Sequence, residues 1–344
     1  MRNLMLVGVM LLSIVLTACS GGSRTEEPQL SGTPQLVTDH VGKMSDLNPT
    51  TAEVEKARQM LGEGFMGLLS CTESTDFHAT LVAAAKARAA ELGLKLETFN
   101  SDTKAEKQLP AIRNFVEKGA KVLIVCVLDA DLVKPVLAEA MQQGVWVIEY
   151  AGSNLNVNGI TVGVGDQNAA LGCAAGQMTG ELIAKEKGGQ ATVAILDYPS
   201  LPQVVVRADN IEKCLLEKAP QAKIVGRFLG GTTENGLKSM SEALDQHPDI
   251  DVVASINDAG AYGALTALQA AGKDSKTTIV VGVDAEEKAR DLIKAGGFYR
   301  GTVDTAPAKT GQAVIDGAAK LLAGAVVPKQ IEGEISKVTA DTLK

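Results

Sequence analysis

Phe65 to Gly93 reads FMGLLSCTESTDFHATLVAAAKARAAELG, and this stretch decides the fold of the chain. An apolar run over Phe65–Leu69 gives way to a polar loop over Cys71–His78. Helical spacing then follows at Leu81, Ala84, Ala85, Arg88 and Leu92. Strand, loop and helix in this order form the first unit of an alternating α/β domain. Because ligands bind at the carboxyl ends of strands in open parallel sheets, the loop Thr72–His78 is the predicted place for a ligand.

The same unit recurs through the rest of the sequence. Further strands are predicted at 94–99, 121–128, 145–150, 160–164, 191–196, 222–228, 252–256, 278–283 and 299–305. Helices are predicted at 103–118, 130–143, 168–187, 204–218, 236–246, 260–272, 285–296 and 307–323. The near-continuous apolar run Lys121–Leu128 is typical of a strand buried on both faces, which indicates a parallel sheet. Since the pattern starts again at Gly165–Asn168, the sequence predicts an α/β fold with two similar doubly wound lobes.

Length and composition allow two domains and exclude some functions. A chain of 344 residues with 45% hydrophobic content is long enough for two real cores. The formal net charge of −8 argues against nucleic acid or anionic lipid as the partner. The sequence contains neither a Gly-x-x-x-x-Gly-Lys-Ser/Thr phosphate loop nor a Gly-x-Ser-x-Gly elbow, and its His and Cys residues lack metal-ligand spacing. We therefore expect no enzyme, no metal and no cofactor, with a two-lobed hydrolase left as an alternative.

The amino terminus has the pattern of an export signal. Arg2 precedes an apolar run, Leu4–Leu16, that is too short for a membrane-spanning helix of roughly 20 residues. The run ends in Leu-Thr-Ala-Cys, which looks like a lipobox, so residues 1–18 are predicted to be a signal peptide. Cys19 then becomes the lipidated first residue of the mature chain, which places the protein outside the cytoplasm on a membrane. An ordinary N-terminal core strand is the alternative.

A tether is predicted to follow the lipidated cysteine. Ser20–Pro49 is rich in Gly, Ser, Pro, Thr and Glu and has no apolar periodicity, which is typical of a flexible linker. Residues 19–60 are assigned to the lipidated cysteine and this tether, although Thr51–Leu61 has enough apolar spacing for a helical turn or more.

Four further cysteines lie in the predicted mature chain, where disulfides persist after export. Cys71 and Cys126 lie at or near the ends of predicted strands, whereas Cys173 and Cys214 lie on predicted helices. Pairing 71 with 126 and 173 with 214 keeps each bond within one lobe. Free buried thiols remain the alternative.

Several motifs together resemble a known family. LLSCTESTDFHATLVAAAKARAAELG, the strand and loop Val122–Asp131, DQNAALGCAAG, INDAGAYGALTALQAAG, VVGVDAEEKA and GTVDTAPAKTG occur in the order found in periplasmic ribose-type sugar-binding proteins. The resemblance covers Gly62 to Lys344 and is strongest at Asn257-Asp258 and Val281–Asp284. It implies a type I periplasmic binding protein, here in lipoprotein form, whose two lobes are joined by three hinge strands and clamp a monosaccharide. The lobes would comprise 62–165 with 306–334 and 166–305 with 335–344, crossing near Asp166, Thr305 and Ile335.

The resemblance also implies a set of ligand residues. Asn257 and Asp284 stand where the family has second-lobe ligands, although both also precede helices and suit caps. In the first lobe, Phe77 and His78 match paired aromatic positions, and Thr75 matches an Asn. The set is completed by residues at strand ends and at the last hinge, namely Glu149, Tyr150, Asp304 and Thr305, where Thr305 replaces a Gln.

Two departures leave the ligand open. Ala151-Gly152 replaces the family's Asp-Arg pair, and Val205 replaces another cleft Arg, with Arg207 two residues on. Acidic residues instead occupy loops and strand ends at Glu73, Asp76, Glu149, Asp258, Asp284 and Asp304, which favours a polyol or an amine-bearing solute. The predicted function is therefore a monomeric, lipid-anchored binding protein that delivers a sugar or polyol to an ABC transporter permease. The alternatives are a nucleoside ligand and a sensor that presents its ligand to a chemoreceptor or kinase. Repressors of the lactose type share the two-lobe core but need an N-terminal helix-turn-helix, where this chain has a signal and a tether.

Overall fold

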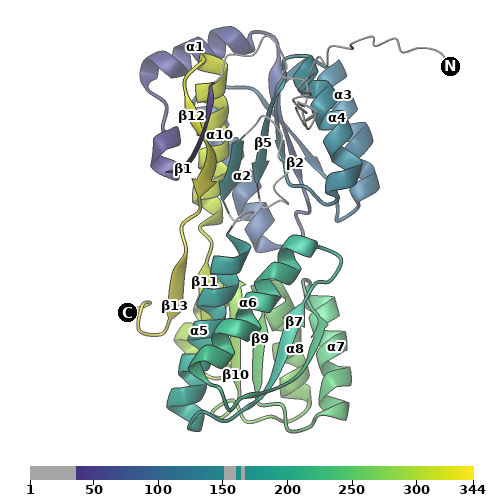
Figure 1. Ribbon diagram of the computed structural model, residues 1–344, viewed down its shortest axis with the longest axis vertical. Helices are drawn as coiled ribbons and strands as arrows, with labels where there is room; N and C mark the ends of the chain where they lie inside the picture. Colours follow the sequence, from purple (N-terminus) through teal and green to yellow (C-terminus); the bar gives the residue numbers. More distant parts are fainter. Residues whose placement is uncertain (1–35, 151–159, 164–166) are drawn as a thin grey trace, which may run out of the picture. The chain divides into compact units, whose positions relative to one another are not determined.

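The computed structural model describes residues 36–150, 160–163 and 167–344, and these form two sheets (Figure 1). The first sheet contains, in spatial order, β1 (Val37–Lys43), β12 (Val327–Glu332), β6 (Ile160–Gly163), β5 (Trp146–Tyr150), β4 (Ala120–Val125), β2 (Phe65–Ser70) and β3 (Leu96–Asn100). The second contains β13 (Ser336–Thr339), β11 (Tyr299–Asp304), β10 (Ile279–Asp284), β9 (Val252–Ser255), β7 (Thr192–Asp197) and β8 (Lys223–Leu229). Neighbouring strands are parallel except for β13, which pairs antiparallel with β11.

Helices cover both faces of the first sheet, because successive strand residues point to opposite sides. Met66 and Leu68 of β2 belong to a core that includes α1 (Thr51–Leu61), α2 (Asp76–Glu91) and α10 (Pro307–Ala323). Phe65 and Leu69 of the same strand belong to another core with α3 (Gln108–Glu117) and α4 (Ala130–Gln142). This sheet with its helices is the first lobe.

The second sheet is built in the same way. Val193 and Ile195 of β7 face the core of α5 (Asn168–Lys187) and α6 (Pro202–Lys218). Ala194 and Leu196 face the core of α7 (Thr233–Gln246), α8 (Asp258–Ala270) and α9 (Glu287–Ala295). This sheet with α5 to α9 is the second lobe, so the predicted doubly wound two-lobe fold is confirmed.

The chain passes between the lobes at the junctions of β11 with α10 and of β12 with β13. These junctions contain Thr305 and Ile335, where the sequence analysis expects crossings. A further passage joins β6 to α5, but its residues 164–166, including Asp166, lie outside the described part of the chain, as does the Ala151-Gly152 departure.

The predicted tether extends too far toward the first strand. Residues Val37–Lys43 form β1, which pairs in parallel with β12, and Met44–Leu47 form a 3-10 helix (η1). Thr50 caps α1, with Glu53 bonding back to the Thr50 amide at 2.7 Å. The assignment of 19–60 to a tether is therefore wrong for its second half. The pattern misses β1 because this strand is at a sheet edge, is mostly exposed, and pairs with a segment from the other end of the chain.

Both predicted disulfides are present. Cys71 is bonded to Cys126 with their Cα atoms 5.3 Å apart, and Cys173 is bonded to Cys214 with a Cα separation of 5.1 Å. The first bond links the segments that follow β2 and β4, and the second links α5 to α6. Each bond stays within one lobe, and none of these four thiols is free.

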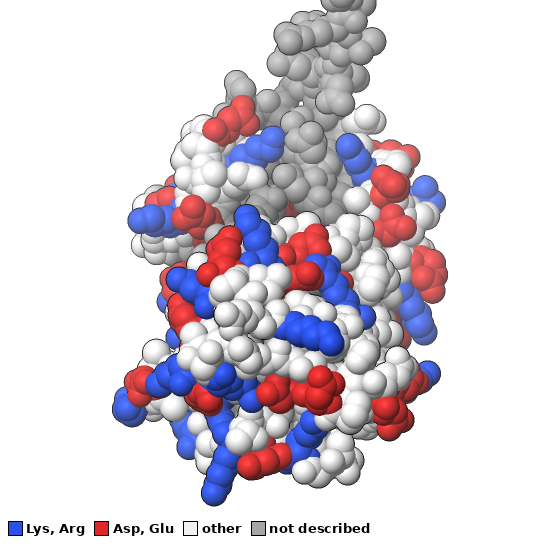
Figure 2. All heavy atoms as spheres, turned by 60° about the horizontal axis from the view of Figure 1, so that its bottom comes forward, with Lys and Arg blue, Asp and Glu red and all other residues white. Residues whose placement is uncertain are grey.

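Charge is spread over the surface. On the face drawn in Figure 2, Lys and Arg side chains alternate with Asp and Glu, and neither sign gathers in a patch. Among the described helices, none has the length and apolar content to cross a membrane. The predicted signal peptide, Cys19 and the first part of the predicted tether lie outside the described residues.

Candidate functional site

A cavity of about 470 Å³ lies at the carboxyl ends of the strands. First-lobe lining comes from the segments after β2, β3 and β4, including Thr72, Thr75, Phe77, His78, Thr103, Leu128 and Asp129. Second-lobe lining comes mainly from α6 and from the segments after β7, β8, β9 and β10, including Tyr198, Gln203, Val204, Arg207, Thr232, Asn257 and Asp284. Both sheets thus contribute to the site where parallel sheets bind ligands.

Five of the predicted ligand residues line this cavity: Thr75, Phe77, His78, Asn257 and Asp284. Thr75, Phe77 and His78 follow β2 in the first lobe, whereas Asn257 follows β9 and Asp284 ends β10 in the second lobe. The structure therefore brings together the two halves of the predicted site.

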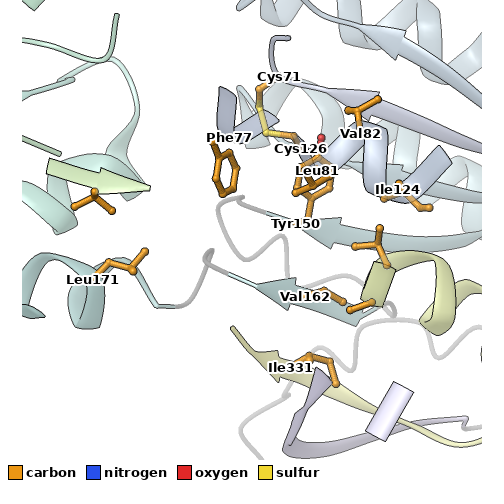
Figure 3. Packing of buried hydrophobic residues seen from close by; sticks show 14 of the residues in the cluster. Cys71, Phe77, Leu81, Val82, Ile124, Cys126, Tyr150, Val162, Leu171 and Ile331 are labelled. Atoms are coloured by element: carbon orange, nitrogen blue, oxygen red, sulfur yellow. A yellow bond between two sulfur atoms is a disulfide. The ribbon is translucent and has the colours of Figure 1, made fainter. Parts of the chain in front are cut away.

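Glu149 and Tyr150 do not line the cavity, because both side chains are enclosed within the first lobe. Both are almost fully buried. Glu149 accepts a hydrogen bond from the Thr161 hydroxyl on β6 at 3.5 Å, and the Tyr150 hydroxyl donates to the Leu69 carbonyl at 3.5 Å. Figure 3 shows the Tyr150 ring packed in the first-lobe core near Leu81. These two residues support the wall of the site from within the sheet.

Asp304 and Thr305 also lie away from the cavity, at the passage between β11 and α10. Asp304 forms an ion pair with Arg290 at 2.6 Å and accepts from the Ala306 amide at 2.8 Å. Thr305 is fully buried. Asp304 therefore fixes the hinge, where Ala306 has a φ of 48°, and the predicted ligand role of both residues is not supported.

Phe77 and His78 occupy the first turn of α2, facing the cavity. Their rings meet edge to face with centroids 4.9 Å apart, and the His78 ring lies 6.4 Å from that of Tyr150. Burial lowers the pKa of His78 to about 4, because a charged imidazolium would lose its hydration there. His78 Nδ1 is buried and has no hydrogen-bond partner among the described residues. The imidazole is therefore neutral at physiological pH.

Asn257 has the cap role that the sequence analysis weighs for it, and it also lines the cavity. Its Oδ1 accepts from the Gly260 amide at 3.0 Å, which caps α8, and its Nδ2 donates to the Gly231 carbonyl at 2.9 Å. The amide thus stands in one fixed orientation at the cavity wall. One N–H and one oxygen lone pair remain for a ligand.

Asp284 ends β10 with a strained backbone. Its φ is 113°, a value that residues with a side chain rarely adopt, and its side chain lines the cavity while the residue is 7% exposed. Burial raises the pKa of this carboxyl well above its usual value, and the neighbouring Arg207 opposes that rise. Glu286, two residues on, occupies the cap position of α9, so Asp284 is not that cap.

Arg207 lines the cavity. It lies two positions after Val205, which the family resemblance aligns with a cleft Arg. Its Nε donates to Asn168 Oδ1 at 2.9 Å, and its Nη1 donates to the Ile256 carbonyl at 2.7 Å. Burial lowers the pKa of Arg207, and Asp284 offsets the effect. The helical spacing of Val204 and Arg207 puts both on one face of α6, and Val205 is not part of the lining. That spacing was the sequence signal for Arg207.

Close packing of α5 on α6 holds Arg207 in place. A Cβ added at Gly172 of α5 would lie 2.1 Å from the Arg207 carbonyl oxygen, so only glycine allows this approach. The sequence reasoning gave no role to this glycine. Asn168, at the start of the same helix, then reaches the guanidinium.

Most of the predicted acidic set does not face the ligand position. Glu73, Asp76, Asp258 and Asp304 are absent from the lining, whereas Asp284, Glu106 and Asp129 belong to it. Asp258 is fully buried and accepts from the Tyr299 hydroxyl at 2.6 Å, the Thr302 hydroxyl at 2.7 Å and the Glu286 amide at 2.9 Å. Burial raises its pKa to about 7. This carboxyl joins α8 to β11 and to the start of α9.

The cavity therefore offers an aromatic ring, hydrogen-bond donors and hydrogen-bond acceptors to a ligand. Phe77 supplies an apolar face, Arg207 supplies donors, and Asp284 supplies acceptors. No group of His, Cys, Asp and Glu in the described ranges could hold a metal ion. Such a site suits a small neutral molecule with several hydroxyl groups.

Comparisons with known proteins identify the family and support the fold. Residues 66–325 match the family model described as periplasmic binding protein domain. The chain is 28% identical over 243 residues to the D-apiose import binding protein of Actinobacillus succinogenes, covering 70% of this chain and 76% of that protein. It is 26% identical over 260 residues to the ribose import binding protein of Salmonella typhimurium, covering 75% and 85%. A solute-binding protein structure from Actinobacillus succinogenes with bound D-allose has a TM-score of 0.73 at 23% identity, covering 81% of this chain and 99% of that chain.

Proposed function

Since the chain belongs to the ribose-type family of periplasmic sugar-binding proteins, we propose that its cavity captures one monosaccharide or related small polyol for an ABC importer. Members of this family are binding proteins of transporters, not enzymes, and they work outside the cytoplasm. The delivery of the solute to a permease is part of the proposal. The lipid anchor at Cys19 belongs to it as well, on the strength of the Leu-Thr-Ala-Cys motif.

One observation carries the proposal: a single cavity is lined by an aromatic ring from one lobe and by a fixed donor and acceptor pair from the other. Phe77 offers a flat surface for the C–H face of a sugar ring. Arg207 and Asp284, which are near enough for their charges to interact, offer donors and acceptors for neighbouring hydroxyl groups. The volume of about 470 Å³ lies within the usual range for small-molecule sites.

The ligand is proposed to be uncharged. The charge of Arg207 is offset by the nearby Asp284, and His78 is neutral at physiological pH, so an anionic solute would find no free countercharge among these three groups. Thr75 and Asn257 complete the proposed ligand set. Because that set comes from both lobes, the bound solute would favour the state in which the lobes close on it.

A thermal-shift screen with purified mature chain tests the ligand class. The panel contains D-ribose, D-apiose, D-allose, myo-inositol, D-glucosamine and adenosine, each also assayed for chemical change. A ligand at a hundred times its Kd adds about 2.7 kcal/mol to the free energy of unfolding, which raises the melting temperature measurably. We expect a neutral sugar or polyol to give the largest shift and to remain unchanged. Stabilisation by glucosamine or adenosine alone, or turnover of any compound, contradicts the proposal.

The anchor is tested separately. In cells that express the full chain, Cys19→Ala should leave the protein unlipidated and released from the membrane fraction, as measured by fractionation and mass spectrometry. Membrane retention of this variant through another segment would contradict the lipoprotein assignment.

A further inference from the structure

The two disulfides differ in their relation to the cavity. Cys71 and Cys126 are part of its lining, whereas Cys173 and Cys214 are not. Cys71 directly follows β2 and Cys126 directly follows β4, two strands that are neighbours in the sheet. Figure 3 shows this bond beside Phe77 and above Tyr150. It therefore ties two central strands together at the edge where the ligand is proposed to bind.

The segments that follow these two cysteines form much of the first-lobe wall. Thr72, Thr75, Phe77 and His78 come after Cys71, and Leu128 and Asp129 come after Cys126. Any change in the position of either segment would shift groups that are proposed to touch the solute.

The segment after β4 is clamped by a buried glutamine. Gln108 Nε2 donates to the Cys126 carbonyl at 2.7 Å and to the Ser101 hydroxyl at 3.2 Å, and Gln108 Oε1 accepts from the Leu128 amide at 3.1 Å. Gln108 is fully buried, so these bonds are shielded from water. This side of the disulfide is rigidly fixed to the first lobe.

The segment after β2 is held less firmly. Within the described residues its hydrogen bonds are local: the Ser74 amide and hydroxyl both pair with the Thr72 hydroxyl, and Ser70 pairs with Glu73. Thr75 precedes α2 without a side-chain cap bond. The longer-range links at its start are the disulfide and a bond from the Thr103 amide to the Cys71 carbonyl at 2.8 Å. Residues 72–75 are thus attached through Cys71 at one end and through α2, whose Phe77 lies in the core, at the other.

We propose that the Cys71–Cys126 disulfide positions the first-lobe wall of the cavity by fixing residues 72–78 to the segment clamped by Gln108. The ligand effect of this positioning rests on the proposed function, but the ordering of residues 72–78 does not. Breaking the bond should therefore loosen this wall and weaken solute binding, over and above any loss of global stability.

The second disulfide provides a matched control. It closes a loop of 41 residues, against 55 for the first, so the two bonds constrain the unfolded chain to a similar degree. Helices α5 and α6 are also in close backbone contact without it, since a Cβ at Gly176 would lie 2.3 Å from the Ile211 carbonyl oxygen. Its removal should lower the melting temperature without disturbing residues 72–78.

Hydrogen–deuterium exchange measured by mass spectrometry tests the positioning without any ligand. The mature parent is compared with Cys71→Ala/Cys126→Ala and with Cys173→Ala/Cys214→Ala. We expect peptides that cover residues 72–80 to exchange at least tenfold faster in the first variant and within twofold of the parent in the second. Equal exchange of these peptides in the parent and the first variant, or equal loosening in both variants, overturns the proposal. If the first variant fails to fold, Cys71→Val/Cys126→Ala restores part of the apolar volume and takes its place.

Calorimetry with D-ribose, D-allose and myo-inositol tests the effect on binding. For each probe that binds the parent, Kd should rise at least tenfold in Cys71→Ala/Cys126→Ala and stay within twofold in Cys173→Ala/Cys214→Ala. Unchanged affinity in the first variant overturns the link between the disulfide and binding. If none of these probes binds the parent, the proposed function is in question, whereas the exchange result alone decides whether the disulfide orders the wall.

Discussion

The two walls of the cavity are held in different ways. In the second lobe, the Asn257 side chain is hydrogen-bonded to the Gly260 amide and to the Gly231 carbonyl. Arg207 is hydrogen-bonded to Asn168 and to the Ile256 carbonyl. In the first lobe, Phe77 and His78 are held by ring packing, and His78 Nδ1 has no partner among the described residues. One wall presents oriented polar groups, and the other presents two aromatic rings together with polar side chains such as Thr72, Thr103 and Asp129.

The difference indicates how the two lobes would divide the recognition of a solute. Groups that are already hydrogen-bonded lose little side-chain entropy when they bind a ligand. The second lobe is therefore suited to distinguishing the orientations of the solute's hydroxyl groups. An aromatic platform reads shape and apolar area, with little directional preference. We therefore expect substitutions in the second lobe to weaken binding more than those in the first.

The largest effect is expected for Asp284→Ala. It removes an acceptor next to Arg207 and leaves that buried guanidinium without its charge partner. A charge-assisted hydrogen bond contributes roughly 1.5 to 3 kcal/mol, so Kd should rise about ten- to hundredfold for the solute identified by the thermal screen. Calorimetry measures this change. Asp291→Asn, on exposed α9, is the control and should bind like the parent. Equal affinities for Asp284→Ala and Asp291→Asn would show that the second lobe does not read the solute.

A smaller effect is expected for Phe77→Ala. Loss of an aromatic face costs about 1 to 1.4 kcal/mol, which is a five- to tenfold rise in Kd. Phe77 is only 7% exposed and packs in the core with Leu81, so its ring also supports the fold. The variant should also lose about 3 kcal/mol of unfolding free energy. Phe77→Leu keeps most of the volume and separates the two effects, since it should recover stability more than affinity. If both variants bind as tightly as the parent, the ring is a core residue only.

The fold could be predicted from the sequence where strands are buried and their connections are short. The run Lys121–Leu128 predicts β4, and the strand–helix alternation predicts both sheets, because each element carries its own periodicity. In contrast, β1, β12 and β13 were missed. These short strands pair with segments distant in the sequence and lie at or near sheet edges, so no local apolar pattern marks them.

Site residues that lie at a strand end could be predicted from the sequence. Site residues whose side-chain direction depends on packing could not. Asn257 and Asp284 come directly after β9 and at the end of β10, and the carboxyl-end rule places them correctly in the cavity. Glu149 and Tyr150 satisfy the same rule, but Tyr150 packs in the first-lobe core and Glu149 is buried beside Thr161 of β6. Arg207 enters from the first turns of α6, where only the packing of α5 through Gly172 determines its direction.

The smallest effect on affinity is expected from the ionisation of His78. Its pKa is about 4 in the folded protein, against 6.5 for an exposed histidine, so the ring stays neutral at pH 5.5 and above. The ratio of Kd between the parent and His78→Gln should therefore be constant from pH 5.5 to pH 8. Stability should behave differently, because the unfolded chain takes up the proton first. Because the pKa of His78 is lower in the folded protein, its contribution to the free energy of unfolding is fully present above pH 6.5. This contribution is lost as the pH falls toward 4.

Relative to His78→Gln, the parent should thus lose up to about 2 kcal/mol of unfolding free energy between pH 7 and pH 5. Denaturant titrations of both proteins at the two pH values measure this. Comparing the two proteins cancels Asp258, whose pKa of about 7 acts in the opposite direction in both. A difference in unfolding free energy that does not change with pH would mean that water reaches the imidazole. The first-lobe wall would then be a polar surface like the second, and the contrast between the two walls would fail.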